Sequence, residues 1–251
     1  MNPLFPIVHE DDELLVVNKP AGLVCHPTKG DEYSSLISRI RLHLPENATA
    51  HLVNRLDRET SGLVMVAKTD ETARELRRVW ESREVQKEYL AIVHGRPERD
   101  QGAIDAPLGR DEDSIVAVKN RVREDGAQAL TSYEVKRPFQ RNGASFALLG
   151  VRPETGRKHQ IRIHLAHIGC PIVGDKLYGG DENLYLDFVK DQLTEAQRRR
   201  LVLPNQALHA ERLSFAWRGG ITVFQAESEP WFDAFSGSGE LPDLVWPDRP
   251  A

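Results

Sequence analysis

The chain has 251 residues, enough for one large domain or two small ones with a substantial core. Hydrophobic residues make up 40% and charged residues 28%, as in ordinary globular proteins. Net charge is −5, from 33 basic and 38 acidic residues, which on its own weakly disfavours a nucleic-acid partner. No apolar run approaches the roughly 20 residues that a membrane helix needs, so a membrane-spanning protein is excluded and we expect no membrane partner.

The N-terminus lacks the basic start and apolar middle of a secretory signal. Two cysteines, Cys25 and Cys170, lie far apart and beside no ligand-like pair, which disfavours a disulfide framework or a zinc ribbon. We therefore expect a cytoplasmic protein.

The distribution of charge qualifies the net value. Basic residues gather in "RLDR", in "ARELRRVWESREVQK" and in "VRPETGRKHQIRIH". A basic face on an acidic body can bind the phosphates of RNA. With one such face and no obvious apolar patch, a monomer is expected.

Apolar runs and alternation predict the strands, and Gly or Pro ends most of them. The expected strands are 13–19, 62–68, 87–95, 129–137 and 145–153, with a final hairpin over 213–226 that turns at Gly219-Gly220.

Helical spacing of apolar residues predicts the helices. They are 35–44 with Ser34 as N-cap, 69–85, a short helix around 159–168 ended by Gly169, and a polar helical insertion over 181–201. Residues 96–126 are expected to be loop-rich. The fold class is α+β, a mixed and mostly antiparallel central sheet with flanking helices and loops. One catalytic domain is expected over 1–235, followed by a tail over 236–251.

The segment "HLVNRLDRETSGLVMVAKT", residues 51–69, places Asp57 between Arg55 and Arg58 at the start of an expected strand. Most such neighbours are surface ion pairs or turn caps. The alternative is functional, because a nearby arginine keeps a partly buried carboxylate ionised and able to act as nucleophile or base.

Tyr89 and Arg162 also have two readings each. Tyr89, in an expected strand, either fills the core or stacks on a nucleobase. Arg162, inside an apolar helical repeat, is unusual unless it reaches a partner, and Asp57 is a candidate carboxylate. Arg157, Lys158 and His159 fall at the expected helix start, where free N–H groups favour phosphate.

The histidines His159, His164 and His167 raise the possibility of a metal. Their spacing is not His-x-x-x-His and no zincin-type glutamate accompanies them, so helix-face histidines are favoured and no metal is expected. Phosphate-binding glycine loops and the G-x-S-x-G elbow are also absent from the sequence, so no cofactor is expected.

Taken together, five segments resemble the RluA-type pseudouridine synthases of the RsuA/RluA family, in a short form without a front RNA-binding domain. They are "VVNKPAGLVCHP", "NRLDRETSGLVMVAK", "QKEYLAIVHG", "ETGRKHQIRIHLAHIGCPIVGDKLYG" and "LHAERLSF". Their order matches the family from about residue 8 to 235. The resemblance implies the pseudouridine synthase fold and isomerisation of a specific uridine in rRNA or tRNA, with RNA and not DNA as the partner.

The resemblance implies a role for individual residues. Asp57 is similar to the catalytic aspartate, Arg162 to the arginine that pairs with it, and Tyr89 to the tyrosine that stacks on the target base. Further residues are implied in substrate binding: Arg55 holds the flipped nucleotide, Thr60, Ser61 and Gly62 shape the loop, and Ile161 or Ile163 forms an apolar wall. For Arg58 we expect a contact to phosphate or a role in loop structure.

One position departs from the family pattern. The usual His-Arg-Leu-Asp reads Asn54-Arg-Leu-Asp here, which puts in doubt how the loop is held. Two rival functions remain open at this stage. One is a non-catalytic RNA-binding or ribosome-assembly module on the same fold, and the other is a metal-dependent hydrolase that uses the histidines.

Overall fold

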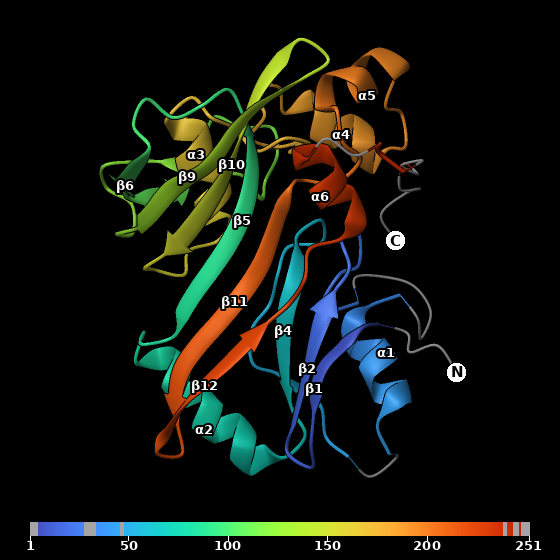
Figure 1. Ribbon diagram of the computed structural model, residues 1–251, viewed down its shortest axis with the longest axis vertical. Coiled ribbons are helices and arrows are strands. Elements are labelled where there is room, and N and C mark those ends of the chain that lie inside the picture. The colour runs from blue at the N-terminus through green and yellow to red at the C-terminus, as the bar shows by residue number, and fades with distance from the viewer. Residues whose placement is uncertain (1–4, 28–33, 46–47, 238–239, 243–245, 247–251) are drawn as a thin grey trace. The chain divides into compact units, whose positions relative to one another are not determined.

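The structure is a computed structural model that describes residues 5–27, 34–45, 48–237, 240–242 and 246. The chain divides into two compact units, whose elements are labelled in Figure 1. Unit 1 consists of Met1–Lys87 and His209–Glu229, and unit 2 of Glu88–Leu208 and Pro230–Pro250. The single domain expected over 1–235 stays a prediction. None of the helices in the described residues combines the length and apolar character that crossing a membrane requires.

Unit 1 is built on a mostly antiparallel sheet with strand order β1-β2-β4-β11-β12, and β3 pairs with β4 as well. Its strands are β1 (Ile7–Glu10), β2 (Leu14–Lys19), β3 (His51–Leu52), β4 (Ser61–Ala67), β11 (Leu208–Trp217) and β12 (Gly220–Gln225). The pairing of β4 with β11 is parallel and brings Ser61 opposite His209 and Gly62 opposite Ala210. The expected mostly antiparallel sheet is thus confirmed in this unit.

Helices cover both faces of the unit 1 sheet, which explains the continuous apolar runs of β2 and β4. Alternate residues of these strands point to opposite faces. One set packs with α2 (Asp70–Glu81), and the other packs with α1 (Leu36–His43). The α2 face contains Leu14, Val16, Leu63, Met65 and Leu76, and the α1 face contains Leu15, Val17, Val64, Val66, Leu36 and Ile40. β4 is buried along its whole length.

Within unit 2 the antiparallel strands follow the order β5-β10-β9-β6, and β7 and β8 form a two-stranded sheet. The strands are β5 (Gln86–His94), β6 (Gln101–Asp105), β7 (Leu108–Arg110), β8 (Asn120–Val122), β9 (Leu130–Arg141) and β10 (Ala144–Pro153). The region 96–126, expected to be loop, therefore contains three short strands. Their brevity and mixed charge hide the period-2 pattern that predicts longer strands.

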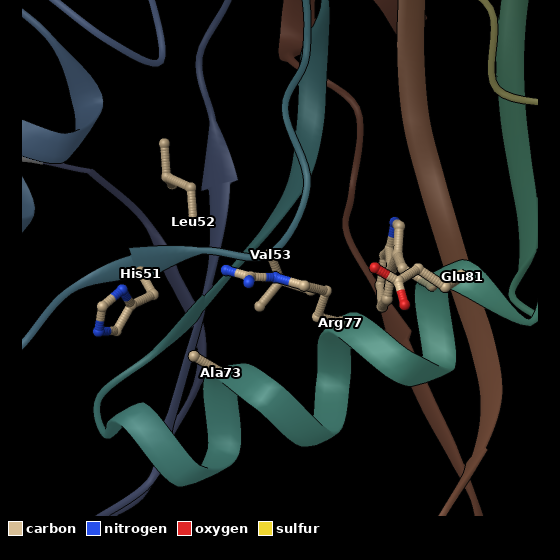
Figure 2. Close-up of a pocket in the computed structure, with 7 residues that line it drawn as sticks. His51, Leu52, Val53, Ala73, Arg77 and Glu81 are labelled. Atoms are coloured by element: carbon tan, nitrogen blue, oxygen red, sulfur yellow. The ribbon is translucent and has the colours of Figure 1, made fainter.

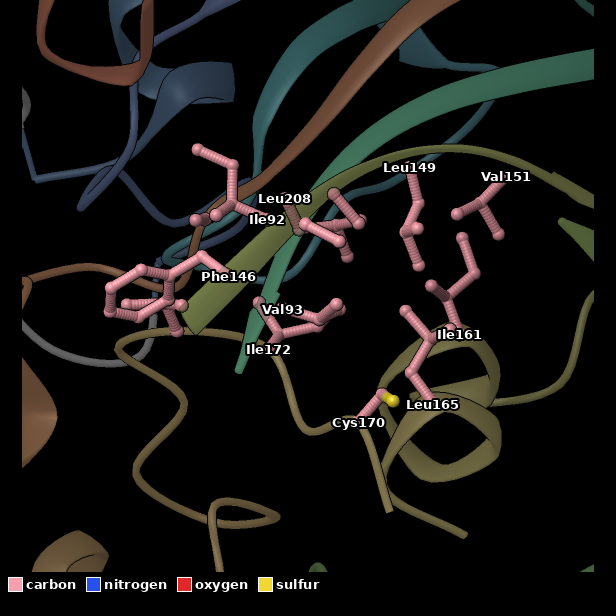
Figure 3. Packing of buried hydrophobic residues seen from close by; sticks show 14 of the residues in the cluster. Ile92, Val93, Phe146, Leu149, Val151, Ile161, Leu165, Cys170, Ile172 and Leu208 are labelled. Carbon is pink, nitrogen blue, oxygen red and sulfur yellow. The ribbon is translucent and has the colours of Figure 1, made fainter. Parts of the chain in front are cut away.

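Helix α3 (Gln160–His167) is buried on several sides. Figure 3 shows Ile161 and Leu165 in the same hydrophobic cluster as Leu149 and Val151 of β10. On another side of the helix, Ile163 packs in a separate cluster with residues that include Leu177 and Tyr178. Three polar residues of α3 (Gln160, Arg162, His164) are buried too and must find partners inside the protein.

The remaining helices belong to unit 2. The helical insertion predicted over 181–201 is two short helices, α4 (Asn183–Val189) and α5 (Glu195–Leu201). α6 (Pro230–Ser236) buries Phe232 and Phe235 in the unit 2 core, and Arg137 and Arg141 donate hydrogen bonds to carbonyls at its C-terminal end. Within the predicted tail, Leu241 packs against this core and the ring of Trp246 lies 5.6 Å from the Arg198 guanidinium.

Two sequence predictions shift by one residue. Ser35, not Ser34, caps α1, since its hydroxyl accepts from the backbone N–H of Ser38. The last hairpin turns at Arg218-Gly219, because Trp217 pairs with Gly220. Both turn residues have positive φ, 49° and 79°, as a two-residue turn that follows the sheet twist requires.

The buried imidazole of His164 is held in one neutral form. Its Nε2 lies 2.9 Å from the carbonyl of Ala106, which only accepts, so Nε2 carries the proton. Nδ1 then accepts from the Thr131 hydroxyl at 2.9 Å, and that hydroxyl accepts in turn from Gln160 Nε2. Burial lowers the pKa of His164 below its ordinary value of 6.5.

We predict that His164 contributes to loss of stability in acid. Below about pH 6.5 the unfolded chain takes up a proton that folded His164 does not, so this group lowers the free energy of unfolding by up to about 1.4 kcal/mol per pH unit. Urea unfolding between about pH 5 and about pH 7 should show a shallower pH slope for His164→Gln than for the wild type. The control, His167→Gln on the exposed side of α3, should keep the wild-type slope. Equal slopes for all three proteins would contradict the assignment.

Candidate functional site

The loop that carries Asp57 joins β3 to β4 in unit 1. Its backbone turns between Asp57 and Thr60, whose N–H donates to the Asp57 carbonyl at 3.2 Å. Asp57 is half-buried and Arg55 is exposed, whereas Thr60 is buried. The loop therefore presents its carboxylate at the entry of a fully buried strand, where the sequence predicts it.

Asn54 holds the start of this loop against β4. Its side-chain NH₂ donates to the carbonyl of Leu63 at 3.0 Å, and its Oδ1 accepts from the N–H of Met65 at 2.8 Å. One amide thus satisfies a backbone acceptor and a backbone donor on the same strand. The departure from the usual histidine leaves the loop anchored, three residues before Asp57.

Lys19 anchors the other side of the loop. Its fully buried ammonium donates to the carbonyls of Pro20, Leu23 and Arg58, at 2.8 to 3.0 Å. Burial lowers the pKa of Lys19 to about 8, and electrostatic interactions with Cys25, Glu229 and Asp57 oppose this shift. The ammonium therefore ties the segment after β2 to the residue that follows Asp57.

Arg58 contributes to the same connection. Its Nε donates to the carbonyl of Gly22 at 3.0 Å, and the N–H of Gly22 donates to the Arg58 carbonyl at 3.0 Å. Of the two roles expected for Arg58, these contacts support the role in loop structure.

The residues after the loop, expected to shape it, are buried at the start of β4. The Ser61 hydroxyl lies 2.9 Å from Nδ1 of His209, whose Nε2 lies 3.1 Å from the carbonyl of Ala226. Because that carbonyl accepts, Nδ1 accepts from Ser61. Gly62 has φ +113°, and a Cβ there would lie 2.3 Å from the Ala210 carbonyl. Only glycine allows β4 and β11 to approach this closely.

Tyr89 lies on β5 in unit 2, opposite Val151 of β10. Its side chain is half-buried and packs against the unit 2 core. This position is compatible with both sequence readings, a core residue and a ring that presents one face to a base.

Arg162 lies on α3 and has a partner that the sequence reading did not identify. Its Nε and Nη2 donate to Oδ2 and Oδ1 of Asp175, at 2.7 and 2.9 Å. The guanidinium also lies 5.0 Å from the centre of the Tyr178 ring. Complete burial alone raises the pKa of the Asp175 carboxyl, but the charge and hydrogen bonds of Arg162 outweigh it and lower that pKa.

The residues expected at the start of α3 are there. Arg157 and Lys158 are exposed, and the Arg157 Nε donates to the carbonyl of Gln128 at 3.0 Å. His159 is the N-cap with φ 56°, and its Nδ1 lies 2.9 Å from the Tyr178 hydroxyl. Ile161 and Ile163 lie in hydrophobic clusters, so their expected role as a wall beside a base stays a prediction.

A pocket of about 180 Å³ lies in unit 1 between β3 and α2 (Figure 2). It is lined by His51, Leu52, Val53, Ala73, Arg77, Trp80 and Glu81. Asp57 is not among them, so this pocket is not the predicted catalytic site. Among the residues that the structure describes, no group of three or more His, Cys, Asp or Glu side chains is arranged to hold a metal ion.

Sequence reasoning missed Lys19, Asp175 and His209 as parts of the site. Lys19 ends a buried strand, where a charge needs partners, and Asp175 stands among glycine and apolar residues in "IVGDKLYGG". Both signals were visible in the sequence. Nothing near His209 in the sequence pointed to Ser61, which is 148 residues away.

We predict that Asn54→Asp loosens the Asp57 loop. The acid keeps an acceptor for Met65 but loses the donor to Leu63, and sets a carboxylate oxygen against that carbonyl. The free energy of unfolding, measured in urea, should fall by about 1–3 kcal/mol. The same change at exposed Asn142, in a β-turn, should cost less than about 0.5 kcal/mol. Equal effects at both positions would contradict the anchoring role.

We predict that Lys19 titrates near pH 8. Because this pKa lies below the ordinary 10.5, the unfolded chain binds more protons between the two values, and the Lys19 contribution to the free energy of unfolding increases with pH in that window. NMR titration of the lysine Cε resonances, with Lys19 assigned by its absence in Lys19→Met, measures the midpoint. A midpoint near 10.5 would contradict the burial of this ammonium.

The chain matches the RNA pseudouridylate synthase family over residues 13–167, a range that includes Asp57, Tyr89 and Arg162. A ribosomal large subunit pseudouridine synthase D of Nitrosomonas europaea is 40% identical over 210 residues, which are 82% of this chain and 56% of that protein. An uncharacterized RNA pseudouridine synthase of Bacillus subtilis is 36% identical over 215 residues, 83% of this chain and 63% of that protein.

A solved structure supports the fold. Human RNA pseudouridylate synthase domain containing 4 has a TM-score of 0.69 at 28% identity, over 90% of each chain. The chain spans only 56% and 63% of the length of the two curated relatives. The match over residues 13–167 covers more than half of the sequence and confirms the resemblance to this family. The chain belongs to the RNA pseudouridylate synthase family.

Proposed function

We propose that the chain converts uridine to pseudouridine in an RNA, with Asp57 as the catalytic residue. The observation that carries this proposal is the anchoring of the Asp57 loop by Asn54, Lys19 and Arg58 within a family match that includes all three. A surface ion pair or a simple turn cap would not require a buried ammonium and a half-buried amide to fix its backbone. The loop is built to hold one carboxylate in place.

The reaction is an isomerisation. The C1′–N1 bond breaks, the uracil turns within the site, and a C1′–C5 bond forms, while C5 loses a proton and N1 gains one. No electrons are exchanged with another molecule. A target base inside a stack must first be flipped out, at a few kcal/mol. Contacts to phosphate and stacking offset this cost.

The proposed roles follow the two units. Asp57, ionised, engages the ribose or base, and Arg55 on the same loop holds the flipped nucleotide. From unit 2, Arg162 keeps the carboxylate unprotonated and Tyr89 stacks on the base. Ile161 or Ile163 forms the apolar wall. Exposed Arg157 and Lys158, with His159 at the N-terminus of α3, bind RNA phosphate.

We further propose that the substrate is ribosomal RNA of the large subunit. The names of several relatives, among them the ribosomal large subunit pseudouridine synthases D of Nitrosomonas europaea and Pseudomonas aeruginosa, favour it over tRNA. RNA is the only macromolecular partner proposed. The monomeric state and the cytoplasmic location stay predictions.

We predict that Asp57→Asn abolishes turnover and leaves folding and RNA binding nearly intact, because the amide keeps the size but not the charge. Tritium release from C5-tritiated uridine in ribosomal RNA should fall by at least about 1,000-fold. Asp12→Asn, an exposed carboxylate of the same unit, serves as the control and should keep wild-type release.

Two outcomes would overturn this proposal. Release by Asp57→Asn well above background would show that another group carries the reaction. Wild-type protein that binds ribosomal RNA without any release would favour the non-catalytic RNA-binding module. Tritium release from tRNA but not from ribosomal RNA would be consistent with the role of Asp57 and would make tRNA the substrate in place of ribosomal RNA.

A further inference from the structure

The surroundings of Arg162 are unusual for an arginine. It is 8% exposed, lies on a helix that is buried from Gln160 to Leu165, and has hydrophobic clusters on either side. Removing a guanidinium from water costs several kcal/mol unless an anion and hydrogen bonds replace the lost hydration. Asp175 supplies both.

The contact with Asp175 fixes the orientation of the guanidinium, not only its charge. Two parallel hydrogen bonds join the Nε and Nη2 edge to the two carboxylate oxygens, at 2.7 and 2.9 Å. Such a fork defines the plane of the group as well as its position. Asp175 uses two of the five N–H donors, and the Nη1 edge faces away from this carboxylate. The ring of Tyr178, 5.0 Å from the guanidinium carbon, supports it from another side.

Asp175 is itself held by the backbone. Its Oδ1 also accepts from the N–H groups of Leu177 and Tyr178, at 2.8 and 3.0 Å, and its own N–H donates to the carbonyl of Ile172. The preceding Gly174 has φ +79°, and a Cβ there would lie 2.3 Å from the Asn205 carbonyl. The carboxylate cannot move without disrupting this tight turn.

Tyr178 is fixed at its far end. Its hydroxyl oxygen accepts from the N–H of Asn120 at 3.2 Å and lies 2.9 Å from Nδ1 of His159. The Tyr178 ring that contacts Arg162 is therefore hydrogen-bonded to β8 and to the N-cap of α3. Asp175 and Tyr178, which contact the guanidinium, are therefore both held by hydrogen bonds within unit 2.

We propose that Asp175 is a positioning residue, which acts through Arg162 and sets the place of the guanidinium edge that meets the reacting nucleotide and Asp57. This inference rests on the proposed function. A buried ion pair adds little net stability over apolar residues of similar volume, whereas it imposes a defined geometry. A displacement of a catalytic contact by about 1 Å can reduce a rate by about 100-fold.

The first test separates positioning from folding. Single-turnover tritium release at saturating ribosomal RNA yields a rate constant for the folded molecules and an amplitude for their number. We expect Asp175→Asn to lower the rate constant by about 100-fold and to change the RNA Kd by less than about 3-fold. In an Arg162→Lys background, where no fork can form, the further effect should be about 3-fold or less.

A matched control lies in the same unit. Asp181 pairs with Arg200 at 3.4 Å on an exposed surface, and Asp181→Asn should keep the wild-type rate constant. If Asp175→Asn lowers only the amplitude, Asp175 is merely structural and the inference fails while the proposed function stands. If the two substitutions at 162 and 175 reduce the rate independently, the inference fails as well.

A second test does not depend on catalytic activity. The Nε–H of Arg162, assigned by its loss in Arg162→Lys, should give an NMR signal with slow solvent exchange and the order of rigid backbone. Fast exchange and a mobile side chain would overturn the inference. Absence of tritium release from wild-type protein with every RNA would instead overturn the proposed function and leave this result unaffected.

Discussion

The position of the Asp57 loop depends on the buried ammonium of Lys19. Its three hydrogen bonds to backbone carbonyls join the segment after β2 to the residue that follows Asp57. A buried charge without such partners would be strongly destabilising. The amide of Asn54 fixes the loop on its other side, and the close approach of Gly62 to β11 fixes the strand that receives it. The carboxylate of Asp57 is thereby held on a backbone that has little freedom.

Unit 2 also contains a buried cation, but its partner is a carboxylate and not a set of backbone carbonyls. There a buried guanidinium is fixed by a buried carboxylate, and the carboxylate by backbone N–H groups. In each unit a buried charged side chain is held by several hydrogen bonds. This pattern suits a reaction in which a freed base must reorient without leaving the site, because rigid side chains preserve the geometry through each step.

Much of the fold followed from the sequence, and the reasons are physical. β2 and β4 were predicted because their apolar runs are continuous, and burial on both faces by α1 and α2 explains that continuity. The short strands between 96 and 126 were not predicted, since three to five residues of mixed polarity are too few to show an alternation of polar and apolar side chains. The predicted turn, Gly219-Gly220, differs by one residue from the observed turn at Arg218-Gly219. The sequence did not distinguish the two registers because Gly219 and Gly220 both tolerate positive φ.

The site was only partly predictable. Asp57, Tyr89 and Arg162 were proposed from motifs. Lys19 and Asp175 stand among apolar residues, which indicates burial, but the partners that define their roles come from distant parts of the chain or from the backbone and cannot be identified from the sequence. The meeting of Asp57 with Arg162 is the central claim. The most direct measurement is a crystal structure of the protein with a bound uridine-containing RNA. We expect the Asp57 carboxylate within about 4 Å of the Arg162 guanidinium, beside a flipped uridine. A uridine bound elsewhere, or two side chains on opposite sides of the molecule, would contradict it.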